Sequence, residues 1–134
     1  MHAVVLTRVV LAILMSLSIR GVSADSFEFA GIKRSYSLLV PTSAVAPAPL
    51  IVLLHGSYGN AAAIVSWWTS LAEQEGIVLV APDAREREAW QLRADGPQFI
   101  RAVIDEVAGK HPIDRGRIYL FGRSGGAVYS LTLS

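Results

Sequence analysis

The chain alternates between short apolar runs and longer amphipathic segments. Five short segments have the character of β-strands, and three of these are apolar at nearly every position, as expected of parallel strands covered on both faces. Gly31 separates the first two, and a Pro/Ala-rich connector at 41–49 follows the second. The predicted strands are 27–30, 34–40, 50–54, 77–82 and 117–122, and we expect the last three to be buried.

Two amphipathic segments have helical periodicity. The first begins at a capping residue, Asn60, and ends at Gly76; the second has Pro97 in its first turn, and Gly109 helps to end it. A third helix begins after residue 125. The predicted inward faces are Ile64, Trp67, Trp68 and Leu71 in the first helix, and Ile100, Val103, Ile104 and Val107 in the second.

The order of these elements is strand, strand, and then strand–helix three times. Such an order predicts an α/β fold, a three-layer sandwich whose mostly parallel sheet follows an N-terminal antiparallel hairpin. Residues 25–134 would form one domain.

The N-terminal 24 residues have the layout of a secretory signal peptide. Arg8 precedes an apolar run at 9–19, and the small residues of Val22-Ser23-Ala24 predict cleavage before Asp25. An uncleaved anchor or a buried helix is the alternative, because Arg20 is unusual at this position. Cleavage predicts a secreted or periplasmic protein with no membrane attachment.

Charge and cysteine content exclude several classes of function. The 134-residue chain has 12 Lys/Arg and 11 Asp/Glu; loss of Arg8 and Arg20 would leave ten basic residues, so no basic surface for nucleic acid is expected. With no cysteine and only three scattered histidines, neither a disulfide framework nor a structural zinc site is expected. The mixed charges of REREAWQLR (85–93) indicate a solvated loop.

The segment IYLFGRSGGAV carries the main chemical signal, a G-x-S-x-G pattern between a strand and a helix. There, Ser124 would stand on a sharp turn as a nucleophile, and Gly122 and Gly126 would allow strand and helix to approach closely. The N–H of Gly125 would point to the oxyanion of an acyl-transfer intermediate. An ordinary Gly-rich turn is the alternative.

A second signal, LLHGSYGN (53–60), follows the first predicted parallel strand. Gly56 would let the backbone turn near the substrate, and the N–H of Ser57 would be the second oxyanion donor. We expect His55 to hold this loop by hydrogen bonding, with catalytic base as the less favoured role.

The stretches PLIVLLHGSYGN, GIVLVAPDA and DGPQFIRAVIDEVAGKHPIDRGRIYLFGRSGGA resemble the N-terminal half of secreted α/β-hydrolase esterases of the polyhydroxybutyrate depolymerase and feruloyl esterase group. The resemblance spans about residues 33–132 and implies a serine ester hydrolase without cofactor or metal, acting on small-molecule or polymeric esters. By position it implies Ser124 as nucleophile, with Ser57 and Gly125 as oxyanion donors. Relatives commonly have His and Ala where this chain has Arg123 and Gly125, which puts efficiency in doubt.

The catalytic acid and histidine of this fold follow the nucleophile in sequence, and residues 125–134 contain neither. We expect His111 to lie on the surface at the opposite end of the sheet, Asp83 to cap or shape the cleft, and Trp90 to form a cleft wall. The chain is therefore expected to be the N-terminal part of a hydrolase, from a truncated reading frame or gene decay, with weak activity at best.

The alternative function is a non-catalytic remnant or binding module that keeps the fold. A nucleotide-binding domain is disfavoured, since no G-x-G-x-x-G or P-loop follows a strand.

Overall fold

The computed structural model describes residues 21–134, so most of the predicted signal peptide lies outside the described residues. The predicted order of strands and helices is confirmed, with one short additional helix, α2. The elements are β1 (Ser23–Phe29), β2 (Ile32–Leu39), β3 (Ala48–Leu54), α1 (Ala61–Glu75), β4 (Val78–Pro82), α2 (Leu92–Asp95), α3 (Pro97–Lys110), β5 (Ile113–Gly122) and α4 (Gly125–Leu133).

The described strands form one mixed sheet in the order β1-β2-β4-β3-β5. β4 and β5 pair in parallel with β3, whereas β1 and β2 form an antiparallel hairpin whose second strand joins β4 antiparallel. The hairpin turns through Ala30 and Gly31 with φ of 50° and 75°. Because β3, β4 and β5 are parallel, the loops after their carboxyl ends meet at one edge of the sheet.

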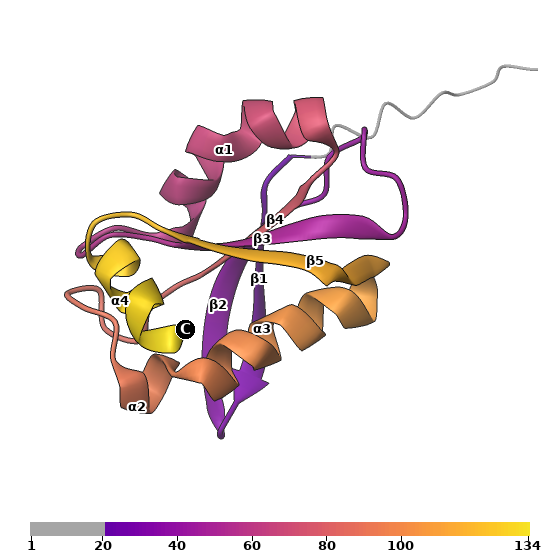
Figure 1. Ribbon diagram of the computed structural model, residues 1–134. Coiled ribbons are helices and arrows are strands. Elements are labelled where there is room, and N and C mark those ends of the chain that lie inside the picture. Colours follow the sequence, from indigo (N-terminus) through magenta and orange to yellow (C-terminus); the bar gives the residue numbers. More distant parts are fainter. Residues whose placement is uncertain (1–20) are drawn as a thin grey trace, which may run out of the picture.

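Helices cover the sheet on two faces, α1 on one and α3 with α4 on the other (Figure 1). Each face has its own hydrophobic core. Ile100, Val103 and Val107 of the predicted stripe are buried, and Ile104 is partly buried against the same core. Phe99, which was not predicted, is also buried there, and the helix continues past Gly109 to Lys110. The α/β sandwich is therefore confirmed.

The caps of α1 agree with the prediction, but only part of its predicted inward face does, namely Ile64, which is buried, and Trp68, which packs partly against the core. Asn60 accepts a hydrogen bond from the N–H of Ala63, and Gly76 ends the helix with φ of 67°. Trp67 and Leu71, predicted to face the core, are 58% and 39% exposed. The buried face is formed by Ile64 together with Ala61, Val65 and Ala72, because small alanines let the helix lie close to the sheet.

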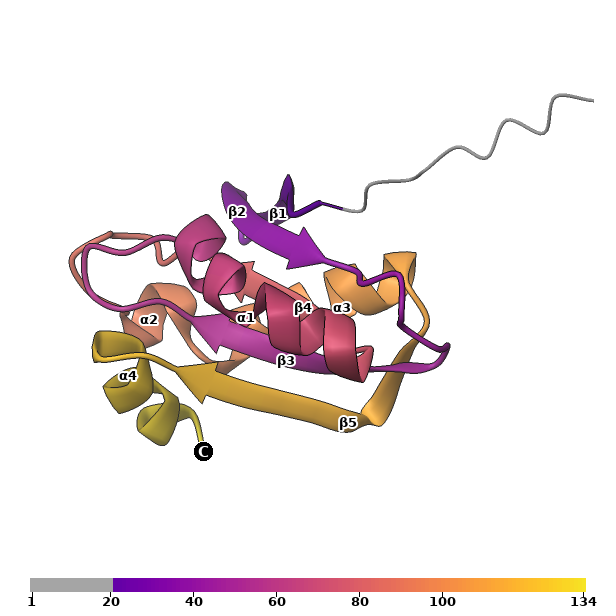
Figure 2. The ribbon, with the colours of Figure 1, turned by 90° about the horizontal axis from the view of Figure 1, so that it is seen from above.

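The predicted strand at 117–122 is present as part of β5, but it is not buried among residues 21–134. β5 lies at the margin of the sheet, far from the hairpin (Figure 2). Within residues 21–134 only one of its edges is paired, and Tyr119, Leu120 and Phe121 are 56%, 40% and 39% exposed. Its apolar composition indicates burial, whereas the structure places it at the edge of the sheet, where its apolar side chains are only partly covered.

Candidate active site

Ser124 stands on a strained turn between β5 and α4. Its φ of 51° and ψ of −118° are rare for a residue with a side chain. It precedes α4 without making a side-chain capping hydrogen bond, and it is exposed. The Ser124 side chain is therefore accessible to solvent, and it lies by the positive end of the dipole of α4.

The two outer glycines of the G-x-S-x-G pattern lie where backbones come into contact. A Cβ on Gly122 would collide with the Gly126 carbonyl, and a Cβ on Gly126 would collide with the carbonyl of Leu54 and lie 2.6 Å from that of His55. The Arg123 N–H donates to Leu54 O over 3.0 Å. The start of α4 is thus pressed against the end of β3, which positions Ser124 beside the loop that follows β3.

The His55–Gly56–Ser57 loop packs against this turn. A Cβ on Gly56 would lie 3.4 Å from the Ser124 Cβ, and a Cβ on Gly125 would lie 3.3 Å from the Ser57 nitrogen. The structure therefore brings together all four residues named as nucleophile, loop glycine and oxyanion donors, at the edge where parallel strands end.

His55 is 3% exposed, and both of its ring nitrogens are occupied. Nε2 accepts a hydrogen bond from the Ala84 N–H (3.1 Å), which leaves Nδ1 to donate to Gly56 O (2.8 Å). A histidine with both nitrogens engaged in this way cannot take a proton from Ser124 without breaking the loop's own bonds. Its geometry suits a loop-holding role.

Asp83 follows β4 and fixes the first turn of α1. Its Oδ1 accepts from the Ala61 N–H and its Oδ2 from the Ser35 hydroxyl, both over 2.8 Å. The carboxylate thus satisfies a free N–H at the start of a helix, as a cap does.

Trp90 does not form a cleft wall. Its side chain is 9% exposed and lies between His55 and Tyr129. The ring stacks on that of Tyr129, with centroids 5.6 Å apart, and meets the tilted His55 ring at 4.8 Å. The prediction that 85–93 form a solvated loop is therefore only partly confirmed. Residues 85–89 are exposed, whereas Trp90 is part of the core. The charged residues around Trp90 in the sequence indicate an exposed loop, so its burial could not be predicted from them.

Sequence reasoning missed a buried ion pair beneath the same loop. Arg34 and Asp95, 5% and 0% exposed, lie 2.6 Å apart. Asp95 also accepts from the N–H groups of Arg85 (3.0 Å) and Gln91 (2.9 Å), so one carboxylate holds both ends of the segment that carries Trp90. The partners are 61 residues apart in the chain, and no local motif joins them.

The Arg123 side chain contacts Trp67 on α1. Its guanidinium carbon lies 4.3 Å from the ring centroid of Trp67, a cation–π contact between the turn and α1. This contact accounts for an exposed tryptophan on α1.

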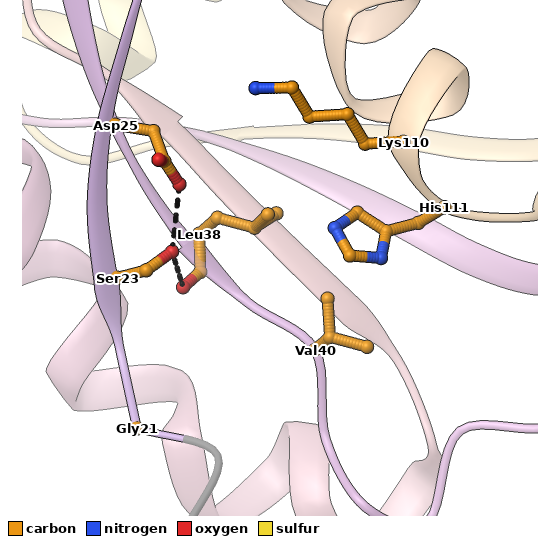
Figure 3. Close-up of a pocket in the computed structure, with 7 residues that line it drawn as sticks. All are labelled: Gly21, Ser23, Asp25, Leu38, Val40, Lys110 and His111. Atoms are coloured by element: carbon orange, nitrogen blue, oxygen red, sulfur yellow. Dashed lines mark hydrogen bonds between the residues drawn. The ribbon is translucent and has the colours of Figure 1, made fainter.

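His111, after α3, lies at the opposite end of the sheet from Ser124. It lines a pocket of about 420 Å³ with Lys110, Asp25 and the start of β1 (Figure 3). Nearby, burial raises the pKa of Tyr36, and the hydrogen bond to Glu106 raises that of Lys110. As β2 runs antiparallel to β4, this pocket lies at the amino ends of the parallel strands and has no part in the site.

Within residues 21–134, no group of three or more His, Asp or Glu side chains could hold a metal ion. Nor does any helix there combine the length and apolar character needed to cross a bilayer.

The fold is that of α/β hydrolases, and the sequence is similar to those of esterases and polyester depolymerases. No protein-family model matches it. It is 30% identical over 108 residues to poly(3-hydroxyalkanoate) depolymerase C of Paucimonas lemoignei, covering 71% of this chain and 26% of that protein. It is 28% identical over 104 residues to a bifunctional acetylxylan esterase/xylanase of Neocallimastix patriciarum, covering 75% of this chain and 16% of that protein.

Solved structures show the same fold. The poly(3-hydroxybutyrate) depolymerase LpqC of Bordetella parapertussis matches with a TM-score of 0.65 at 19% identity, covering 79% of this chain and 44% of that one. An S-formylglutathione hydrolase of Agrobacterium tumefaciens matches with a TM-score of 0.67 at 18% identity, covering 82% and 51%. The chain therefore spans about half or less of these relatives' lengths.

Proposed function

We propose that this chain carries the nucleophile and oxyanion part of a carboxylic ester hydrolase, with Ser124 as nucleophile. The observation that supports this most is the strained Ser124 turn packed against the Ser57 loop. An elbow of this kind is used to present a serine above a sheet, beside two backbone N–H donors.

In the proposed reaction, Ser124 Oγ attacks the ester carbonyl carbon, and the carbonyl π electrons move to its oxygen. The N–H groups of Ser57 and Gly125 would stabilise that oxyanion. The tetrahedral intermediate then collapses as the ester C–O bond breaks, and the leaving alkoxide takes up from solvent the proton that the Ser124 hydroxyl released to it. Water later attacks the acyl carbon, which breaks its bond to Ser124 Oγ, releases the acid and returns the proton to Ser124.

Among the described residues, neither His55 nor His111 is placed to accept the proton of Ser124. His55 has both ring nitrogens occupied and His111 lies at the far end of the sheet. Without a base near Ser124, attack is slow, and we expect weak turnover at best from this chain. The substrate class is a carboxylic ester, small or polymeric, with no cofactor.

Export is part of the proposal. Residues 1–24 would direct secretion to the periplasm or the exterior, with cleavage before Asp25. Such cleavage would remove Ser23 and Ala24, which pair with Leu38 and Ser37 at the start of β1, and leave the rest of the hairpin intact. The N-terminal sequence of exported protein tests this directly.

The test of function is turnover of a small activated ester, p-nitrophenyl acetate, by the 134-residue chain. We expect slow release of nitrophenol that disappears in Ser124→Ala and persists in Ser134→Ala, an exposed serine at the end of the same helix segment. Release unchanged in Ser124→Ala would remove Ser124 from the mechanism.

A binding module without catalysis is the second candidate, favoured by the engagement of both His55 nitrogens. It predicts that an ester substrate binds Ser124→Ala as tightly as the wild type while neither protein turns it over.

A further inference from the structure

The Ser57 hydroxyl lies against the α-carbon of Gly125. A Cβ added to Gly125 would lie 2.6 Å from Ser57 Oγ, closer than real Cβ atoms approach, and 3.3 Å from Ser57 N. The nitrogen and the hydroxyl oxygen of Ser57 therefore both lie close to Gly125, the first residue of α4. The lack of a side chain at position 125 is what leaves room for the hydroxyl.

This hydroxyl is available to a ligand. Ser57 is exposed, and the hydrogen bonds that hold its loop among residues 21–134 come from its neighbours His55, Tyr58 and Gly59. Ser57 Oγ takes part in none of these bonds. It can therefore turn about χ1 between staggered positions without breaking the loop.

We propose that the Ser57 hydroxyl is a third hydrogen-bond donor to the oxyanion, beside the N–H groups of Ser57 and Gly125. This assignment rests on the proposed function of Ser124. As Ser124 Oγ bonds to the carbonyl carbon, the carbonyl oxygen gains negative charge, and a hydroxyl on a neighbouring backbone turn can donate its hydrogen to that oxygen. Ser57 keeps its proton and forms no covalent bond, so it is a catalytic donor and not a second nucleophile.

The same contact makes Gly125 a determinant of the hydroxyl's position. A methyl group at 125 would force Ser57 Oγ to rotate out of the space it shares with the oxyanion donors. Gly125→Ala and Ser57→Ala should then remove the same interaction, so their effects should not add.

The experiment measures acetylation of Ser124 by p-nitrophenyl acetate in the full chain, by intact mass and peptide mapping over a time course. Wild type and the control Ser134→Ala should react at one rate. Ser57→Ala should slow acetylation at least about tenfold, since one oxyanion donor is worth roughly 10²–10³ in rate. Gly125→Ala should slow it similarly, and the double variant should be no slower than Ser57→Ala.

The outcomes separate the two proposals. If Ser124 of the wild type is not acetylated, the proposed function fails and the donor assignment falls with it. If Ser124 reacts but Ser57→Ala reacts at the wild-type rate, or the two substitutions slow the reaction additively, the third donor is refuted and the nucleophile stands. Circular dichroism of each variant checks that it is folded.

Discussion

The indole N–H of Trp90 donates a 2.8 Å hydrogen bond to the main-chain carbonyl oxygen of His55. The same ring packs against the His55 imidazole at an interplanar angle of 39°, so Trp90 contacts both the backbone and the side chain of the residue that begins the Ser57 loop. The loop after β4 thus braces the loop after β3.

Trp90→Phe tests this brace. Phenylalanine keeps an aromatic ring between His55 and Tyr129 but leaves the buried carbonyl without its donor, which should lower the free energy of unfolding by about 1–3 kcal/mol. Urea denaturation measures it. The matched control is Trp67→Phe, on an exposed α1 position, where a small change is expected; equal effects of the two substitutions would argue against the brace.

Asp95→Asn should be strongly destabilising. The substitution keeps the shape but leaves the Arg34 guanidinium buried without a counter-charge, which costs about 3–5 kcal/mol. Asp105→Asn breaks an exposed pair with Arg115 and should change the melting temperature little. If Asp95→Asn lowers the melting temperature no more than Asp105→Asn does, the Arg34–Asp95 pair does not stabilise the loop that carries Trp90.

Gly126→Ala should destabilise the site while leaving the fold recognisable. The added methyl would meet the carbonyl oxygens of Leu54 and His55, which belong to the backbone and cannot rotate away, so a loss of about 1–3 kcal/mol is expected. Gly109→Ala is the matched control, because nothing lies within 4 Å of its Cβ and alanine favours the helix by roughly 0.5–1 kcal/mol. A stabilising Gly126→Ala would contradict the close approach of α4 to β3.

Tyr129 carries a prediction about pH. Its hydroxyl is buried without a hydrogen-bond partner, and burial raises its pKa to about 12, with the nearby Asp95 carboxylate contributing. An unfolded tyrosine ionises near 10. Between about pH 10 and 12 the unfolded state therefore loses this proton first, and the stability that Tyr129 contributes falls as pH rises.

Tyr129→Phe should remove this alkaline loss. At pH 7 it should be neutral or stabilising, because it deletes an unpaired buried hydroxyl while keeping the stack on Trp90. Urea denaturation at pH 7 and pH 11 compares the two proteins. A wild type and variant that lose stability in parallel over that range would show that Tyr129 is not the titrating group.

Much of the architecture could be predicted from the sequence because it depends on local signals. Asn60 and Gly76 bound α1 through their own hydrogen bonds and dihedral angles, and G-x-S-x-G marks the turn by its spacing. The face of α1 could not be predicted in this way. Two apolar stripes overlap along it and share Ile64, but Trp67 and Leu71 lie on the exposed side, whereas the small side chains of Ala61 and Ala72 lie against the sheet.

The contacts that hold the loops around the site could not be predicted from the sequence either. Arg34 and Asp95 meet only because β2 lies beside β4 in the sheet, and Trp90 is buried because Asp95 folds its loop inward. These contacts depend on strand order, which no short motif encodes. Ser57 and Ser124 belong to two short sequence motifs, which made them predictable. The residues that hold the surrounding loops lie far apart in the chain and belong to no motif.

The most direct measurement is the site of modification of the 134-residue chain by a fluorophosphonate, mapped by peptide mass spectrometry. The account predicts slow modification at Ser124 as the main adduct, abolished in Ser124→Ala and kept in Ser134→Ala. Modification of Ser57 or of other residues with Ser124 unmodified, or equal labelling of Ser124→Ala, would contradict the account of Ser124 as the nucleophile.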